Sequence, residues 1–360
     1  MIGNDIAVGV IGVGNIGTVH LQSARAIEGI RVAAVADTDP DMRARARKLG
    51  VPVAYSDYGK LLEQEDLDAV VVALPPSLHA DAVVRAAEEG CHAFVEKPFA
   101  PALAEADRMV DATDRAGVFV GVDHTIRYQP EIRRLKEEYE TGALGHVPLC
   151  VISRVNNGPF SPPPADAPVA EWQIDSEVEG YGAVLDLGVH LFDVLEWFFG
   201  EMELSHARMD RQLDLPYEDT ASIQLESRET GTFATLNCGF FQWEEPPDVN
   251  MHLRLDGVAK SVESGEYVPE NFPVYAARSA VENVSRRLQG ETPEFFKPTY
   301  YYRAHYGALE AFLSAIREGR APPVTGEDGR RTIELAERAY EMADRDRPEE
   351  RPKPQPSNES

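Results

Sequence analysis

The first 124 residues alternate between short apolar runs and longer, charged segments. Runs of this kind, with few polar positions, are typical of strands buried on both faces. They lie at residues 6–11, 31–36, 68–74, 92–95 and 118–122, with a shorter candidate strand at 53–55. Helices are predicted between them, at residues 18–27, 40–49, 58–64, 79–89 and 103–116. This alternation predicts an α/β domain with a doubly wound parallel sheet covered by helices on both faces.

The pattern changes after Asp123. Alternating β-rich segments are predicted at residues 147–155, 221–226, 232–241 and 249–255, and helices at 130–139, 188–199, 306–318 and 330–342. These features predict a carboxyl-terminal α+β domain with a large, mostly antiparallel open sheet. We therefore divide the chain into a first domain at 1–124, a second at 125–346, and a proline-rich, charged tail at 347–360 that we expect to be disordered.

A glycine-rich turn follows the first predicted strand. Gly12 lets the chain turn sharply, Gly14 lets the backbone approach a pyrophosphate, and Gly17 lets helix and strand pack closely. The amino terminus of the next helix, at Asn15 and Ile16, offers backbone N–H groups and a positive dipole end to phosphates. The turn alone is a weak signal, but its place between strand and helix predicts a Rossmann dinucleotide-binding unit.

An acidic residue ends the second predicted strand. Asp37 lies twenty residues after Gly17, where a carboxylate accepts hydrogen bonds from the adenosine ribose. The same charge repels a 2′-phosphate. The sequence therefore predicts NAD as the cofactor in preference to NADP.

The composition is strongly acidic. The formal net charge is −26, and only seven of the 35 basic residues are lysines. Such a charge disfavours binding to nucleic acid or to an anionic membrane surface. An acidic, lysine-poor surface stays hydrated in molar salt, so we hypothesise a halophilic protein; an ordinary acidic protein is the alternative.

The cysteines and the apolar runs bear on the compartment. Cys91, Cys150 and Cys238 form no C-x-x-C pair, so neither a zinc site nor a disulfide framework is indicated. The amino terminus lacks a signal-peptide pattern, and the apolar runs are shorter than a membrane span. We expect a cytoplasmic protein with buried, reduced cysteines.

The first catalytic candidate follows the predicted strand at residues 92–95. Glu96, Lys97 and Pro98 lie at the rim of the sheet where ligands of such folds bind. The Lys97 ammonium can stabilise negative charge on a substrate oxygen, and Glu96 can pair with Lys97 and tune its pKa. A surface salt bridge is the alternative.

The second candidate lies at the start of the helix predicted at residues 188–199. Asp186 can cap this helix and orient His190, whose imidazole suits the removal of a hydroxyl proton. A capping aspartate with a structural histidine is the alternative. His190 and Asp193 share a helix face, but no third metal ligand is apparent nearby, so no metal site is predicted. For His20, His79 and His124 structural roles are favoured.

Several motifs, taken in this order, resemble the Gfo/Idh/MocA family of oxidoreductases over residues 6–342. They are the glycine turn with His20, the segment from Leu74 and Pro75 to His79, Glu96-Lys97-Pro98, Arg127-Tyr128-Gln129-Pro130, and the run from Gly182 to Asp193. The resemblance implies that Lys97, Asp186 and His190 form the catalytic set and that the Lys97–Pro98 peptide is cis. Two departures are Leu74-Pro75-Pro76 in place of Thr-Pro-Asn, and Tyr181 within a usual glycine triplet.

The resemblance also implies a function. It predicts an NAD-dependent dehydrogenase that oxidises a secondary hydroxyl of a sugar, polyol or sugar nucleotide and forms a homodimer or homotetramer. An NAD-dependent glycoside hydrolase and a non-catalytic dinucleotide sensor are the alternatives. The cofactor contacts are expected from Gly12, Gly14, Asn15, Ile16, Asp37, Leu74, Pro75, His79, Glu96 and Lys97. The substrate contacts are expected from Lys97, Arg127, Arg154, Asn156, Trp172, Asp186 and His190.

Overall fold

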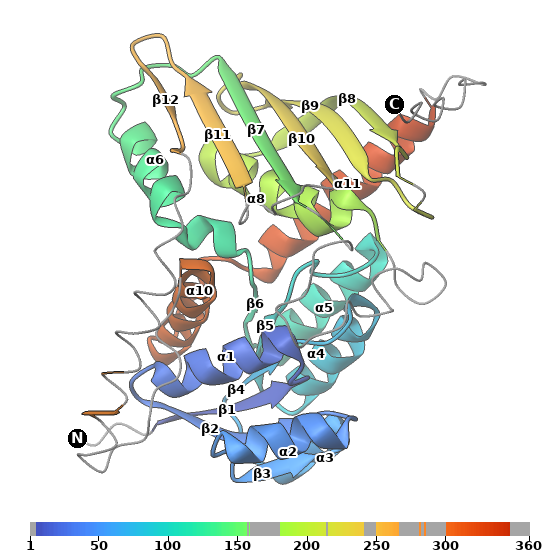
Figure 1. Cartoon of the computed structure of the whole chain (residues 1–360), viewed down its shortest axis with the longest axis vertical. Helices are drawn as coiled ribbons and strands as arrows, with labels where there is room; N and C mark the ends of the chain where they lie inside the picture. Colours follow the sequence, from blue (N-terminus) through green and yellow to red (C-terminus); the bar gives the residue numbers. More distant parts are fainter. Residues whose placement is uncertain are drawn as a thin grey trace, which may run out of the picture.

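The structure is a computed structural model that describes residues 5–156, 158, 181–213, 215–240, 250–265, 281, 284–285 and 300–345. Its described residues form two six-stranded sheets, which we call sheet A and sheet B. Figure 1 shows sheet B at the top of the molecule and sheet A below it. No described helix is both long and apolar enough to cross a lipid bilayer.

Sheet A is parallel throughout, with the strand order β3-β2-β1-β4-β5-β6. Its strands are β1 (Ile6–Ile11), β2 (Ile30–Ala36), β3 (Val53–Tyr55), β4 (Ala69–Val72), β5 (His92–Val95) and β6 (Val120–Val122). The connecting helices are α1 (Asn15–Ala26), α2 (Pro40–Lys48), α3 (Tyr58–Gln64), α4 (His79–Glu88) and α5 (Leu103–Ala116). The predicted doubly wound domain is therefore confirmed.

The apolar runs of sheet A supply two cores, one on each face. In β1, Val8 and Val10 point into one core, while Ala7 and Ile11 point into the other. This alternation follows from the two-residue period of a strand, and it explains why the run has no polar position.

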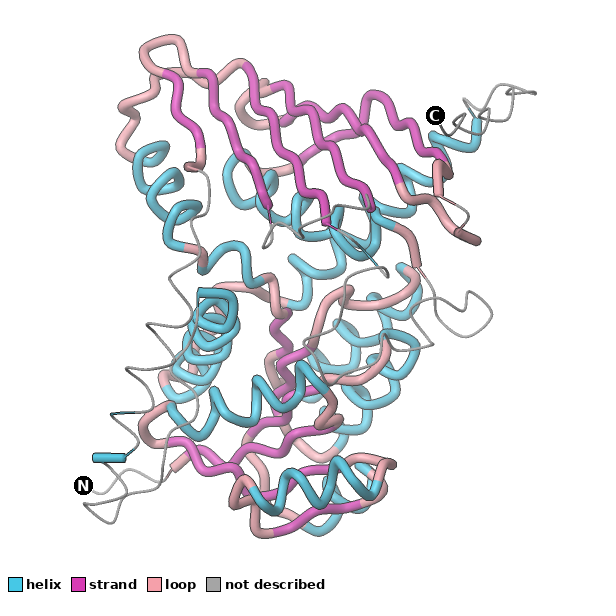
Figure 2. The backbone as a smooth tube through the Cα atoms, viewed as in Figure 1, coloured by secondary structure: helices cyan, strands magenta, loops and turns pink. Residues whose placement is uncertain are grey.

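Sheet B is mixed but mostly antiparallel, as expected. Its order is β12-β11-β7-β10-β9-β8, and only β7 and β10 run parallel. The strands are β7 (Leu149–Asn156), β8 (Met202–Asp210), β9 (Thr220–Ser227), β10 (Phe233–Phe240), β11 (Asn250–Asp256) and β12 (Ser261–Glu263). In β9, buried and exposed residues alternate, so one face is packed and the other is open. Figure 2 shows helices gathered on the side of sheet B that faces sheet A.

The last two described helices return to the first domain. Helix α10 (Tyr300–Arg317) places Leu309, Phe312 and Leu313 in the core that also contains Val8 and Val10. Helix α11 (Gly326–Arg345) packs against α5 and β6 at one end and against β8 at the other, as its course in Figure 1 shows. The two halves of the sequence therefore share cores. The predicted tail at 347–360 lies outside the described residues.

The segment that carries the second catalytic candidate differs from the prediction. A π-helical turn, Val184–Gly188, precedes α8 (Val189–Phe199), so Asp186 lies inside a helical segment rather than at its entry. No side chain caps the start of either element. The expected capping role of Asp186 is therefore wrong, and its carboxylate serves another contact.

Candidate active site

The glycine turn has the shape that a dinucleotide requires. Gly12 has a φ of +83°, and a Cβ added to Gly17 would lie 2.0 Å from the Gly12 carbonyl oxygen. A Cβ added to Gly14 would meet nothing within 4 Å. Gly14 precedes α1, where Asn15 and Ile16 begin the helix without a side-chain cap. The site thus leaves space and backbone donors at a helix amino terminus, which fits a pyrophosphate group.

Asp37 lies against the same turn. One carboxylate oxygen, Oδ2, accepts a hydrogen bond from the Val13 backbone N–H at 2.8 Å, and Oδ1 accepts one from the Asp39 N–H at 2.9 Å. A backbone hydrogen bond also joins the turn to the end of β2, since the Gly12 N–H donates to the Ala36 carbonyl oxygen at 2.8 Å. The acid therefore lies at the cofactor rim, beside the glycine turn.

Lys97 and Asp186 meet across the two halves of the chain. The Lys97 Nζ donates to the Asp186 Oδ1 at 2.5 Å and to the Asp186 carbonyl oxygen at 3.2 Å. Both side chains stay about a quarter exposed, at 24% and 26%. Burial alone would raise the pKa of Asp186, but the charge and hydrogen bond of Lys97 lower it. The Lys97–Pro98 peptide is cis, as the resemblance implied.

His190 lies in the first turn of α8 and is only 3% exposed. Its ring makes an edge contact with the ring of His124, with centroids 5.8 Å apart. Burial, followed by the positive charges of Arg154 and Lys97, lowers the pKa of His190 well below 6.5. Its Nδ1 has no hydrogen-bond partner among the described residues. The imidazole is therefore neutral near pH 7 and able to accept a proton.

Glu96 does not pair with the Lys97 ammonium, contrary to the sequence-based expectation. Its Oε1 accepts a hydrogen bond from the His20 Nε2 at 2.7 Å, and its Oε2 accepts one from the Lys97 backbone N–H at 3.1 Å. Asp123 lies 3.4 Å from His20 and 2.5 Å from the Nδ1 of His305. Glu96 thus belongs to a buried cluster of four ionisable side chains behind Lys97.

This four-residue cluster is a charged hydrogen-bond network. One nitrogen or oxygen atom from each residue lies within 4.8 Å of the others. Two histidines and two carboxylates are also a ligand set that binds transition metals. The contacts of 2.5 and 2.7 Å, however, are hydrogen-bond lengths. Burial opposes protonation of His20, but hydrogen bonds to Asp123 and Glu96 outweigh it and raise its pKa to about 10. No local sequence pattern indicates this role of His305, because its partner Asp123 lies 182 residues away.

Comparison with known proteins agrees with this geometry. Residues 6–124 match the family model described as an oxidoreductase family with an NAD-binding Rossmann fold. Residues 136–350 match the model described as the carboxyl-terminal alpha/beta domain of the oxidoreductase family. The chain belongs to the Gfo/Idh/MocA family of oxidoreductases.

Two relatives are similar to this chain over nearly their whole length. Myo-inositol 2-dehydrogenase of Thermotoga maritima is 27% identical, with 91% of this chain and 93% of the relative covered. D-xylose 1-dehydrogenase (NADP+) 2 of Haloferax volcanii is 28% identical, with 93% and 97% covered.

Two solved structures show the same fold. The crystal structure of a probable dehydrogenase from Thermotoga maritima has a TM-score of 0.77 and 25% identity, covering 95% of this chain and 98% of that one. Scyllo-inositol dehydrogenase from Lactobacillus casei, solved with NAD(H) and scyllo-inositol, has a TM-score of 0.75 and 18% identity, covering 94% and 97%.

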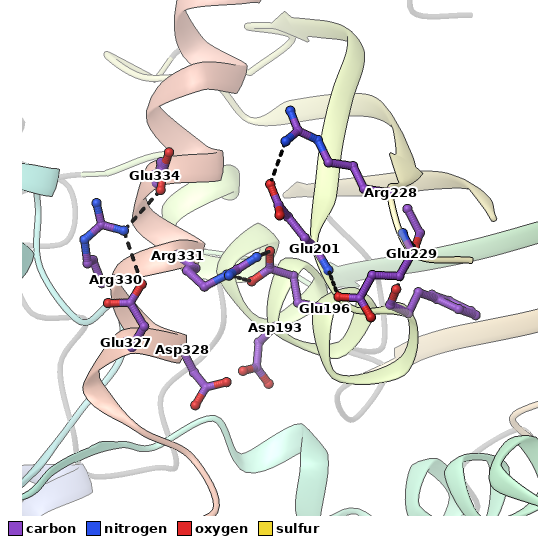
Figure 3. A network of polar contacts seen from close by, with 12 residues as sticks. Asp193, Glu196, Glu201, Arg228, Glu229, Glu327, Asp328, Arg330, Arg331 and Glu334 are labelled. Atoms are coloured by element: carbon purple, nitrogen blue, oxygen red, sulfur yellow. Dashed lines mark hydrogen bonds and ion pairs between the residues drawn. The ribbon is translucent and has the colours of Figure 1, made fainter. Parts of the chain in front are cut away.

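In this Gfo/Idh/MocA chain, two residues that we expect to contact substrate or cofactor form hydrogen bonds with other protein groups. The Arg127 guanidinium is 8% exposed on its side chain and donates to Asp193 at 2.6 and 2.9 Å and to Asp328 at 3.0 Å. Figure 3 shows these two acids, from α8 and α11, beside the Arg331–Glu196 pair. The His79 ring lies 2.8 Å from the Leu74 carbonyl oxygen and 3.2 Å from that of Phe99. Both side chains are thus hydrogen-bonded to protein groups, and their expected contacts with substrate and cofactor stay predictions.

Both carboxylate oxygens of Asp193 accept hydrogen bonds from Arg127. Leu74 lies against the glycine turn, since its Cδ2 is 3.2 Å from the position of a Cβ on Gly12, and Pro75 follows it. Arg154 and Asn156 lie on β7, and Arg154 acts on the pKa of both Asp186 and His190. Trp172 lies outside the described residues.

Proposed function

We propose that this oxidoreductase is an NAD-dependent dehydrogenase that oxidises a secondary hydroxyl group of a sugar, polyol or sugar nucleotide. The observation that carries the proposal is the Lys97–Asp186 contact at 2.5 Å beside a buried histidine of lowered pKa. The named functions of the inositol and xylose dehydrogenases among its relatives support the substrate class.

The side chains divide the chemistry between them. His190, neutral near pH 7, accepts the proton of the substrate hydroxyl, while the Lys97 ammonium donates a hydrogen bond to the same oxygen. Asp186 holds Lys97 in place, in contrast to our expectation that it would support His190. Bound NAD supplies the acceptor for the hydride that leaves the carbon.

The cofactor preference rests on Asp37, whose charge lies beside the glycine turn. A 2′-phosphate at this position would meet a carboxylate of the same sign, and like charges in contact cost several kcal/mol. We therefore propose NAD as the preferred cofactor, although one relative is named for NADP.

We further propose a cytoplasmic, halophilic homo-oligomer. The net charge of −26 with few lysines supports function in molar salt, where screening weakens self-repulsion. On the open face of sheet B, the paired residues Leu149 and Phe233 are 52% and 54% exposed. A second copy of the chain would cover this apolar pair. Light scattering at high salt measures the mass of the assembly, and a monomer would contradict the proposal.

The dehydrogenase assay is a screen of NADH absorbance at high salt. Purified protein with NAD is offered inositols, aldoses, uronic acids and UDP-sugars, with His190→Ala as the test variant. His146→Ala is the matched control, because His146 is exposed and lies in the loop before β7. Turnover of one class that is lost in His190→Ala and kept in His146→Ala supports the proposal.

Two other outcomes would contradict it. NAD binding without turnover of any substrate indicates a dinucleotide sensor. Release of sugar from a glycoside without net formation of NADH indicates a hydrolase that oxidises its substrate transiently and uses the NADH again to reduce the product.

A further inference from the structure

Glu218 lies beneath the π-helical turn that carries Asp186. Its Oε1 accepts a hydrogen bond from the Val184 backbone N–H at 3.0 Å and another from the Tyr340 hydroxyl at 2.7 Å. Its carbonyl oxygen accepts a third, from the Ala183 N–H at 3.0 Å. Glu218 thus satisfies two backbone donors at the start of the turn, which have no earlier carbonyl of the helix to bond.

Gly182 makes room for this carboxylate. A Cβ added to Gly182 would lie 2.0 Å from one Glu218 carboxylate oxygen and 2.2 Å from the other. The Gly182 carbonyl oxygen accepts the hydrogen bond of the Asp186 N–H at 3.1 Å. The glycine therefore lets the Glu218 side chain reach the turn while its own carbonyl holds the residue that contacts Lys97.

The form of the turn decides where Asp186 points. Each residue advances an α-helix by about 100°, so the extra residue of a π-turn changes the direction of the side chains before it relative to those after it. Asp186 lies within the turn and His190 lies beyond it, in α8. If the turn relaxed to regular α-helix, the Asp186 carboxylate would rotate away from Lys97 while His190 stayed packed against His124.

We propose that Glu218, held by the Tyr340 hydroxyl, is a positioning residue that fixes the π-turn and so keeps Asp186 on Lys97. The Tyr340–Glu218 hydrogen bond links two parts of the second domain, since Glu218 precedes β9 and Tyr340 lies on α11. The role of this hydrogen bond in turnover rests on the proposed function, in which Lys97 contacts the substrate oxygen.

The test compares Glu218→Leu with Glu218→Gln. Glutamine has nearly the same shape and keeps an acceptor oxygen for both the Val184 N–H and the Tyr340 hydroxyl, which donate to the same oxygen of Glu218. Misplacing a catalytic group by about 1 Å costs on the order of 100-fold in rate, so we expect kcat of Glu218→Leu to fall by about that factor. Glutamine should restore kcat to within about threefold, and the Kd for NAD should stay unchanged in both variants.

A milder variant keeps the test valid if Glu218→Leu does not fold. Tyr340→Phe removes one hydroxyl, and we expect kcat to fall by about five- to tenfold, the equivalent of one ordinary hydrogen bond. Tyr306→Phe is its control, because the Tyr306 hydroxyl donates to Glu310 on the exposed side of α10 at 3.1 Å. Equal losses in these two variants would contradict the proposal.

Crystal structures of the variants without substrate separate this proposal from the proposed function. We expect Glu218→Leu to lose both the π-turn and the Lys97–Asp186 contact, and an unchanged turn and contact would overturn the positioning role. A lost contact with unchanged turnover would instead support the positioning role and contradict the catalytic use of Asp186.

Discussion

The Asp37 carboxylate accepts a hydrogen bond from the Val13 backbone N–H, 24 residues earlier in the chain, at 2.8 Å. The acid therefore holds the glycine turn with one oxygen while its charge lies at the cofactor rim. Asparagine loses the charge and keeps one acceptor oxygen, which can serve the Val13 N–H of the turn, while the Asp39 N–H outside the turn loses its acceptor.

Asp37→Asn should relax the preference for NAD without disturbing the turn. We expect the ratio of the Kd for NADPH to the Kd for NADH to fall by at least about tenfold, a change of about 1.4 kcal/mol or more. Titration of nicotinamide fluorescence with NADH and NADPH measures both constants. Asp37→Ser should lower the ratio too, and should also weaken NADH because the turn loses its acceptor. Equal affinity of the wild-type protein for the two cofactors would refute the role of Asp37.

Two glycines of the turn should respond in opposite ways to alanine. Gly14→Ala meets open space, so the melting temperature should stay within a few degrees while the Kd for NADH rises by tenfold or more, because the methyl group lies where phosphate is expected. Gly17→Ala puts a Cβ 2.0 Å from the Gly12 carbonyl oxygen, so the protein should be destabilised before any cofactor is added. Thermal unfolding without and with NADH distinguishes the two. A destabilised Gly14→Ala with normal NADH affinity would contradict this reading of the turn.

The pH profile should reveal the lowered pKa of His190. Since the folded protein holds this pKa well below 6.5, the imidazole stays unprotonated at pH 6.5 and above. We expect kcat/KM for hydroxyl oxidation to keep its value down to pH 6.5 and to fall only at lower pH. Arg154→Gln removes a positive charge that lowers the pKa of His190, so its acidic limb should move to higher pH. An acidic limb above pH 6.5 in the wild-type protein would contradict the assignment of His190.

Stability at alkaline pH should depend on His20. The folded state raises its pKa from 6.5 to about 10, so its contribution is fully present below pH 6.5 and is lost as the pH rises through 10. Urea unfolding between pH 6 and pH 10 should show the free energy of unfolding of the wild-type protein converging on that of His20→Gln.

His92→Gln is the matched control for this measurement. Burial lowers the pKa of His92, so the contribution of its neutral form is present above pH 6.5 and is lost as the pH falls below it. The gap between wild type and His92→Gln should therefore not shrink at alkaline pH. A constant gap for His20→Gln over the same range would rule out the charged network.

The features that depend on residues close together in the sequence could be predicted from it. The six strands of sheet A, the glycine turn and the acid at Asp37 follow from apolar runs and spacing. Strand β8 was not singled out, because its polar residues interrupt the alternation and a bulge lies between Leu204 and His206.

Contacts between distant residues left no such pattern. The sequence pattern predicts that Glu96 pairs with Lys97, whereas their partners in the structure are His20 and Asp186, which lie 76 and 89 residues away from them. The π-turn depends on Gly182 and on hydrogen bonds that involve Glu218 and Tyr340, which lie far along the chain from it. These features are set by the assembled fold rather than by any stretch of chain.

The return of α10 to sheet A has a consequence during synthesis. Phe312 and Leu313 fill a core whose other members, such as Val8 and Val10, leave the ribosome long before them. Helix α1 covers part of this face through Leu21 and Ala24, but the part that α10 covers stays exposed until the end of the chain is made. Until then the nascent protein exposes apolar surface that a chaperone would bind, and a chain terminated between the two family domains would leave that surface exposed permanently.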